Sequence, residues 1–242
     1  MAVILPFEVP FYEQAGVPVS FVGHPLADLV QVSLTREQAA ASFGLDPSRL
    51  VVGLFPGSRR SEVSRLLPTI LDAARLLHQR FPTLQFVLPL ASTLSHDDLA
   101  PWLDSCDLPI TITRERIHDL IRACDAVISV SGTVTLEVAL VGTPLVIIYK
   151  LAPLTFQLAK RLVKVEHIGL CNIVAAETVA PELIQDDATA QRIALEIERL
   201  LDDQVNRAVR TRLGRVHERL GGGGANQRVA AIIQRLLQKE MP

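Results

Sequence analysis

Two short turns in this sequence hold residues suited to binding a phosphate. The first is Pro-Gly-Ser-Arg at 56–59, which directly follows an apolar run. Gly57 permits close approach of a ligand to the backbone, Ser58 offers a hydroxyl, and the guanidinium of Arg59 matches the geometry of phosphate oxygens. An ordinary glycine turn explains the same residues, with Ser58 as a helix N-cap and Arg59 in a surface ion pair with Glu62.

The second turn consists of Ser131, Gly132 and Thr133, and it also follows an apolar run. Glu137 comes four residues after Thr133, on the same face of the expected helix, where its carboxylate can accept both hydroxyls of a ribose. The alternative is a first-turn glutamate that interacts with the helix dipole, worth about 0.3–1 kcal/mol. Two such turns in one sheet favour a site for a nucleoside diphosphate sugar, although the chain has neither a Walker loop nor a dinucleotide fingerprint.

The elements that must position these turns alternate, from residue 51 onward, between short apolar runs and segments of helical period. This pattern predicts an α/β fold with a doubly wound, Rossmann-like parallel sheet, in which ligands bind at the carboxyl ends of the strands. Strands are expected at 51–55, 84–90, 110–113, 126–130 and 144–149. Helices are expected at 61–80, 97–106, 116–124, 133–141 and 154–165.

The two ends of the chain do not fit this unit. Within 1–25, strand-like segments at 3–5 and 19–22 flank a short helix without a sheet of their own, which indicates the tail of another domain. Residues 26–185 form the Rossmann-like lobe. Residues 186–242 are expected to be helices that cross back or are exchanged between protomers. The Gly221–Gly224 run follows a helix and lacks a following Lys-Ser/Thr, so we interpret it as a flexible joint.

Composition narrows the class of protein. A net charge of -2 provides no global field for nucleic acid, and 49% hydrophobic residues suffice for a large core. The three cysteines indicate neither disulfides nor zinc, and we expect them to be buried apolar residues in a reducing compartment. The six histidines show no metal-binding spacing or cluster with carboxylates, and His24 is interpreted as a turn residue. The segment 151–165 is amphipathic, which suits a core helix or a membrane-surface helix.

A set of short motifs extends over most of the chain in a fixed order. They lie at 5–8, 11–12, 21–26, Asp28, 56–59, 62–63, Pro68, 131–133, 135–137, Pro144, 149–150, 159–160, 164–165, Asn172, 181–183 and Gln185. In this order and spacing the chain resembles the lipid-A-disaccharide synthases. The resemblance implies the C-terminal, donor-binding lobe of a two-lobed GT-B glycosyltransferase. Residues 1–25 would then be the tail of a mostly missing N-terminal acceptor lobe.

The resemblance also implies an activity. The family transfers 2,3-diacylglucosamine from UDP to 2,3-diacylglucosamine 1-phosphate with inversion, without a metal or a cofactor. The implied partners are the UDP-sugar donor, the lipid acceptor, the N-terminal lobe and a second copy in a homodimer. The implied location is the cytoplasm, with peripheral contact at the inner membrane. Another UDP-sugar enzyme of the same fold, such as an epimerase, and a noncatalytic or split-enzyme half remain as alternatives.

By the same resemblance, the donor-binding residues are Gly57, Ser58, Arg59, Ser131, Gly132, Thr133, Glu137 and Asn172. Asn172 is expected to line the cleft after a strand-like segment at 167–170. The catalytic base is expected in the other lobe, so the lone chain should bind the donor weakly and transfer sugar poorly. The chain departs from the family at Cys171, usually Pro, and at Ala176-Glu177, usually Gly-Arg. These departures weaken the expectation for the loop after Asn172.

Overall fold

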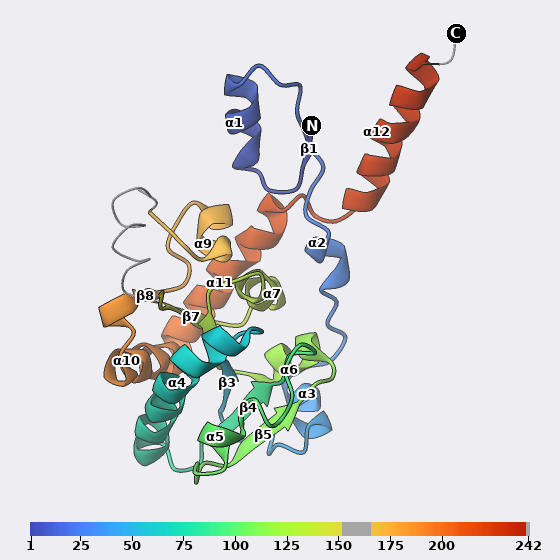
Figure 1. Cartoon of the computed structure of the whole chain (residues 1–242). Helices are drawn as coiled ribbons and strands as arrows, with labels where there is room; N and C mark the ends of the chain where they lie inside the picture. The colour runs from blue at the N-terminus through green and yellow to red at the C-terminus, as the bar shows by residue number, and fades with distance from the viewer. Residues whose placement is uncertain (152–165, 241–242) are drawn as a thin grey trace.

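In the residues that the structure describes, 1–151 and 166–240 of a computed structural model, a sheet of six parallel strands forms the centre of the protein (Figure 1). The strands are β3 (Val51–Phe55), β4 (Gln85–Pro89), β5 (Ile110–Thr113), β6 (Ala126–Val130), β7 (Leu145–Tyr149) and β8 (Glu182–Ile184). Their order across the sheet is β5-β4-β3-β6-β7-β8. This is the order of a Rossmann sheet, with its switch point between β3 and β6.

The five strands expected from the apolar runs are all present, with ends that differ by no more than one residue. Every residue of β3 and β6 is buried, as expected for central strands covered on both faces. The edge strand β8 was not predicted. It has only three residues, and Leu183 alone among them is buried, so it shows no apolar run.

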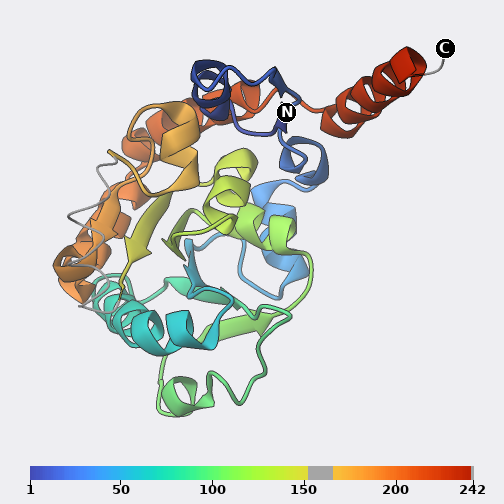
Figure 2. The ribbon, with the colours of Figure 1, turned by 45° about the horizontal axis from the view of Figure 1, so that its top comes forward.

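Helices cover both faces of the sheet (Figures 1 and 2). On one face, α4 (Arg60–Arg80) packs against α10 (Ala190–Leu201), and α10 contacts β6 and β7. On the other, α6 (Ile117–Ala123) packs between α3 (Arg36–Ser42) and α7 (Val134–Val141). Residues of α4 that recur at helical spacing, such as Val63, Leu67 and Ile70, are buried. Burial of each such side chain stabilises the fold by about 1.5–3 kcal/mol.

Several helices differ from the sequence prediction. The helix expected at 97–106 shortens to α5 (Ala100–Leu103). The segment expected to be helical from 186 contains η1 (Gln185–Asp187), α10 and α11 (Asp203–Arg219). The break falls at Asp202, whose carboxylate accepts the backbone N–H groups of Gln204 and Val205 at 3.0 Å and caps α11. The helix expected at 154–165 lies outside the described residues.

The first 25 residues do form a sheet of their own, contrary to the prediction. β1 (Ala2–Val3) and β2 (Ser20–Phe21) pair in parallel, connected through α1 (Glu8–Gln14). The short α2 (Leu26–Leu29) leads from this unit to the main sheet. At the same end of the molecule, α12 (Ala225–Glu240) points away from the body of the protein (Figures 1 and 2).

The glycine run before α12 is held by hydrogen bonds and is not the free joint that its composition indicates. All four glycines have positive φ, so the chain turns sharply here. Asp28 accepts the backbone N–H of Gly224 at 2.7 Å and that of Ala225 at 3.3 Å. Arg228 donates to the carbonyls of Val22 and Gly223. The run is therefore tied to the turn at 22–28.

Candidate donor-binding site

The two predicted turns lie beside each other at the switch point of the sheet. β3 and β6 are neighbours, and Phe55 is opposite Ser129 in their register. Both turns therefore lie at the carboxyl ends of the parallel strands. Open α/β sheets bind ligands in the crevice outside these ends, at the switch point. The two turns therefore lie at neighbouring positions, as a shared site requires.

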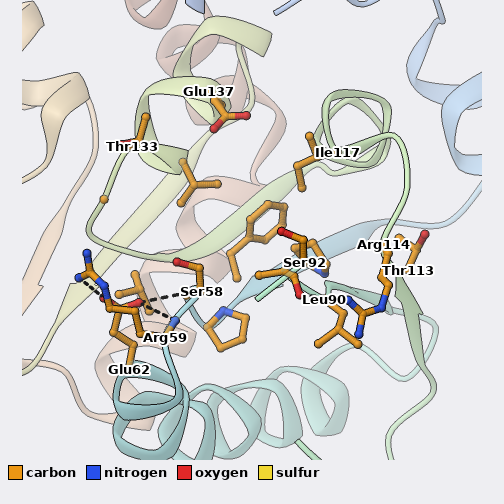
Figure 3. A pocket seen from close by; sticks show the side chains of 18 of the residues that line it. Ser58, Arg59, Glu62, Leu90, Ser92, Thr113, Arg114, Ile117, Thr133 and Glu137 are labelled. Atoms are coloured by element: carbon orange, nitrogen blue, oxygen red, sulfur yellow. Dashed lines mark hydrogen bonds and ion pairs between the residues drawn. The ribbon is translucent and has the colours of Figure 1, made fainter. Parts of the chain in front are cut away.

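A cavity of about 600 Å³ opens between the turns (Figure 3). This volume falls within the range of roughly 300–1,000 Å³ that is usual for small-molecule sites. Seven of the eight predicted site residues line it: Gly57, Ser58, Arg59, Ser131, Gly132, Thr133 and Glu137. In Figure 3, Thr133 just before α7 and Glu137 on α7 lie on one side of the cavity, and Ser58, Arg59 and Glu62 lie across from them.

The loops after β4 and β5 complete the cavity, and the sequence analysis missed them. Leu90 and Ser92 come from the first loop and Arg114 from the second, while Ile117 opens α6. Arg114 donates to the carbonyls of Ala91 at 3.2 Å and Leu94 at 2.6 Å, which ties the two loops together. The signal was available, because these residues also follow the carboxyl ends of predicted strands.

In the first turn, the carboxylate of Glu62 lies against the backbone amides. Its Oε2 accepts the N–H groups of Ser58 at 3.2 Å and Arg59 at 3.3 Å, and its Oε1 accepts Nη1 of Arg59 at 3.0 Å. Gly57 has a φ of 103°, and a Cβ there would lie 2.5 Å from Glu62 Oε2. The Arg59–Glu62 ion pair of the alternative interpretation is thus formed, but the N-cap of α4 is Arg59 and not Ser58.

In the second turn, the backbone runs directly into α7, whose N-cap is Thr133. The hydroxyl of Ser131 donates to the carbonyl of Ile168 at 3.2 Å, and that of Thr135 donates to the carbonyl of Gly132 at 2.7 Å. A Cβ on Gly132 would meet no atom of the described residues within 4 Å. The turn therefore presents open backbone to the cavity at the positive end of a helix dipole.

Glu137 has a hydrogen-bond partner, His118, that the spacing of the histidines in the sequence does not reveal. Nε2 of His118 lies 3.0 Å from Oε2 of Glu137, and both side chains are largely buried. The two residues lie on different helices, so their spacing in the sequence carries no sign of the contact.

Asn172 lies inside the fold, and the expectation that it lines the cleft is wrong. Residues 167–169 form no strand, and α9 (Leu170–Ala175) begins directly after them. The amide of Asn172 is fully buried, accepts the N–H groups of Val179 and Ala180, and donates to the carbonyl of Ala180. It also donates to Glu182 at 2.6 Å, and Glu182 in turn accepts the N–H groups of Ile168 and Gly169. Asn172 therefore holds the loop that contacts Ser131.

The departures from the family at Ala176 and Glu177 have different physical consequences. Ala176 ends α9 with a φ of 49°, in the left-handed region where glycine is favoured. Glu177 pairs with Arg212 at 3.2 Å and with Arg215 at 3.6 Å, both from α11. Neither residue lines the cavity. The carboxylate of Glu177 faces the two arginines of α11 and not the cavity.

The cysteines and His24 are the other side chains that could take part in chemistry, and their contacts indicate structural roles. Cys124 and Cys171 are buried as expected, whereas Cys106 is half-buried. Burial raises the pKa of the Cys171 thiol to about 12, which makes it a poor nucleophile. Nδ1 of His24 accepts the N–H of Leu26 at 3.1 Å, and the backbone N–H of His24 donates to Leu220 at 3.0 Å. Burial lowers the pKa of His24 more than nearby Glu8 raises it. His24 is thus a neutral residue in the turn at 22–28.

Residues 1–151 and 166–240 contain no group of three or more His, Cys, Asp or Glu side chains arranged to hold a metal. Within the same ranges, no helix combines the length and apolar character needed to cross a bilayer.

Comparison with solved structures defines the class of fold. The chain aligns with the UDP-GlcNAc 2-epimerase from Neisseria meningitidis bound to UDP-GlcNAc at a TM-score of 0.66 and 14% identity, covering 98% of this chain and 60% of that chain. It aligns with WaaG, a glycosyltransferase involved in lipopolysaccharide biosynthesis, at a TM-score of 0.60 and 12% identity, covering 96% of this chain and 62% of that chain. The fold is that of the C-terminal lobe of a GT-B protein.

Sequence comparison identifies the family. The family model described as Lipid-A-disaccharide synthetase matches residues 1–233. The chain is 78% identical over 240 residues to the lipid-A-disaccharide synthase of Trichlorobacter lovleyi and 59% identical over 241 residues to that of Geobacter metallireducens, covering 99% of this chain in both cases. The chain belongs to the lipid-A-disaccharide synthase family. It spans 63% of the length of these two relatives.

Proposed function

We propose that this chain is the donor-binding lobe of a lipid-A-disaccharide synthase. The complete enzyme would transfer 2,3-diacylglucosamine from UDP to 2,3-diacylglucosamine 1-phosphate with inversion and without a metal. The observation that supports this most directly is the meeting of two anion-binding turns, after neighbouring strands β3 and β6, on one cavity. The epimerase of similar fold is bound to UDP-GlcNAc, which agrees with a UDP-sugar as the ligand of this lobe.

In this proposal the two turns hold the diphosphate between them. Backbone N–H groups of the 57–59 turn and of Gly132 and Thr133, together with the guanidinium of Arg59, would bind its oxygens. The carboxylate of Glu137 would accept the ribose hydroxyls. The apolar side chains of Leu90 and Ile117, at the side of the cavity near Arg114, would contact the base (Figure 3). Once these groups hold the diphosphate, they can stabilise the charge that develops on the departing UDP.

The acceptor and its base would come from the part of the enzyme that precedes this lobe. An inverting transfer needs a general base beside the acceptor hydroxyl, and we assign no residue of this chain to that role. Four apolar side chains are exposed at the end of the molecule where α1 and α12 lie (Figure 1): Phe7 just before α1, Phe11 on α1, and Leu236 and Leu237 on α12. We infer that the remaining part of the enzyme packs on this end. Mixing this chain with the preceding lobe of the Trichlorobacter lovleyi relative should give a complex on gel filtration.

Peripheral contact with the cytoplasmic face of the inner membrane follows from the lipid nature of both proposed substrates. Vesicles of anionic lipid should retain the intact enzyme at low salt, because basic side chains near the surface are attracted to anionic headgroups. Failure of the vesicles to retain it would remove this part of the proposal.

Calorimetric titration of UDP into the chain tests donor binding. We expect a dissociation constant on the order of 0.1 mM, about -5.5 kcal/mol, for a ligand held by one lobe. Arg59→Ala and Glu137→Ala should each weaken binding roughly fivefold to tenfold, because each removes a charge-assisted hydrogen bond. Arg199→Ala is the control, because Arg199 is an exposed arginine in an i,i+3 ion pair like Arg59 but lies on α10.

Two results would contradict the proposal. One is no detectable binding of UDP at millimolar concentration. The other is equal loss of affinity in Arg59→Ala and Arg199→Ala, because a general effect of surface charge would then explain the data.

A further inference from the structure

The contact between His118 and Glu137 joins two helices beside the cavity. His118 lies in the first turn of α6 and Glu137 in the first turn of α7. Nε2 and Oε2 are 3.0 Å apart, and the two side chains are 23% and 21% exposed. A carboxylate has only acceptors, so Nε2–H of the imidazole donates this hydrogen bond.

The two oxygens of Glu137 have different surroundings. Oε2 is held by His118, whereas Oε1 accepts no hydrogen bond from the described residues. Glu137 lines the cavity, but His118 does not. The imidazole therefore holds one oxygen of the carboxylate from outside the cavity lining and leaves Oε1 available to a ligand. Figure 3 shows the Glu137 carboxylate at the cavity.

The start of α6 is itself fixed by neighbouring groups. Arg116, the N-cap of α6, has a φ of 54°, which is rare for a residue with a side chain. Its guanidinium bonds Asp119 at 2.9 Å and Ser42 at 3.2 Å and lies 5.2 Å from the centre of the Phe43 ring. These contacts with α3 hold the first turn of α6, and with it His118, in one place.

We propose that His118 is a positioning residue for recognition of the ribose of the donor. It fixes the plane of the Glu137 carboxylate, so that Oε1 and the remaining lone pair of Oε2 accept the 2′- and 3′-hydroxyls. Without His118, the glutamate side chain would sample other rotamers and would have to be ordered when the nucleotide binds. This inference rests on the proposed function, because it requires that a uridine nucleotide occupies the cavity.

The test compares two ligands that differ only at the ribose. Calorimetry measures the affinity of the native chain, His118→Ala, His118→Phe and His118→Gln for UDP and for 2′,3′-dideoxyuridine diphosphate. We expect His118→Ala and His118→Phe to bind UDP roughly tenfold more weakly and to bind the dideoxy nucleotide within about twofold of the native chain. His118→Gln retains an N–H donor and should restore most of the affinity for UDP. His217→Ala, at an exposed histidine on α11, is the control.

A double-mutant cycle separates positioning from a general structural role. In the Glu137→Ala background, His118→Ala should have no further effect on UDP binding. Equal weakening for both nucleotides, or no weakening for either, would overturn the role of His118 while leaving UDP binding intact. If the native chain binds no UDP, the proposed function fails and the role of His118 fails with it. His118→Phe keeps the ring volume, so the comparison stands if His118→Ala does not fold.

Discussion

Replacing Glu62 by glutamine should strengthen binding of UDP. The Glu62 carboxylate accepts hydrogen bonds from the backbone N–H groups of Ser58 and Arg59 and from the guanidinium of Arg59. We propose that these same groups bind the diphosphate. A bound phosphate would therefore face a negative charge within a few ångströms and would have to displace it. Glutamine has the same shape without the charge.

The magnitude follows from Coulomb's law. Two like charges at 4 Å repel by about 1 kcal/mol in water and by about 4 kcal/mol at an effective dielectric constant of 20. The Glu62 side chain is 23% exposed and that of Arg59 is 78% exposed, so solvent screens this site and the lower part of the range applies. A gain of about 1–2 kcal/mol corresponds to roughly fivefold to thirtyfold tighter binding.

The same substitution should lower the stability of the fold. It removes a charged acceptor at the first turn of α4 and an ion pair, which together contribute about 1 kcal/mol. We therefore expect the midpoint of thermal unfolding to fall by about 2–4 °C, the shift typical for a chain of this length. Higher affinity combined with lower stability is the expected signature.

Calorimetry with UDP and with uridine provides the measurement. Uridine carries no phosphate, so Glu62→Gln should leave its affinity unchanged. Glu196→Gln is a matched control, because Glu196 is 25% exposed and pairs with Arg199 three residues away on α10. Weaker binding of UDP by Glu62→Gln would refute the reasoning. It would indicate that Glu62 holds Arg59 and the turn in their binding geometry and does not compete with the phosphate.

Three further predictions concern stability. Ala176→Gly should raise the free energy of unfolding, measured in urea, by about 0.5–1 kcal/mol. The left-handed backbone strains alanine by more than the extra conformational entropy that glycine loses on folding. Ala175→Gly, in the same helix, should lower the free energy of unfolding. Asn172→Ala should lower it by about 3 kcal/mol, because it leaves buried groups of Val179, Ala180 and Glu182 without partners, and an unchanged urea midpoint would contradict this. Burial lowers the pKa of His24, so as the pH falls the unfolded chain takes up a proton at this residue before the folded chain does. Stability should therefore fall as the pH drops below 6.5. His24→Gln should show less of this fall between pH 7.5 and 5.5.

Much of the fold could be predicted because its information is local. The runs at 51–55 and 126–130 are apolar throughout since both faces of these strands are covered, and they mark the centre of the sheet. The strand β8 could not be predicted in this way, because an edge strand of three residues has little buried surface. Its Glu182 nevertheless holds the loop at 168–169 through two backbone hydrogen bonds.

The position of Asn172 shows where a motif misleads. A polar residue in a family motif was expected to face the ligand, but its amide satisfies buried backbone groups of the loop at 179–180. Loss of these partners by a buried polar group would cost several kcal/mol of stability. A family motif can therefore contain a residue because the fold needs it or because the ligand needs it, and the motif alone does not distinguish the two.

The sequence by itself determined the strands of the central sheet and the two turns that follow β3 and β6, because hydrophobic period and glycine placement are properties of a few consecutive residues. Only the tertiary structure decided that Glu62 covers the amides of the first turn, that His118 supports Glu137, and that Asp28 holds the glycine run. These contacts join side chains whose directions depend on how helices and turns pack. The lining of the cavity is therefore a consequence of packing, whereas its location follows from the order of the strands.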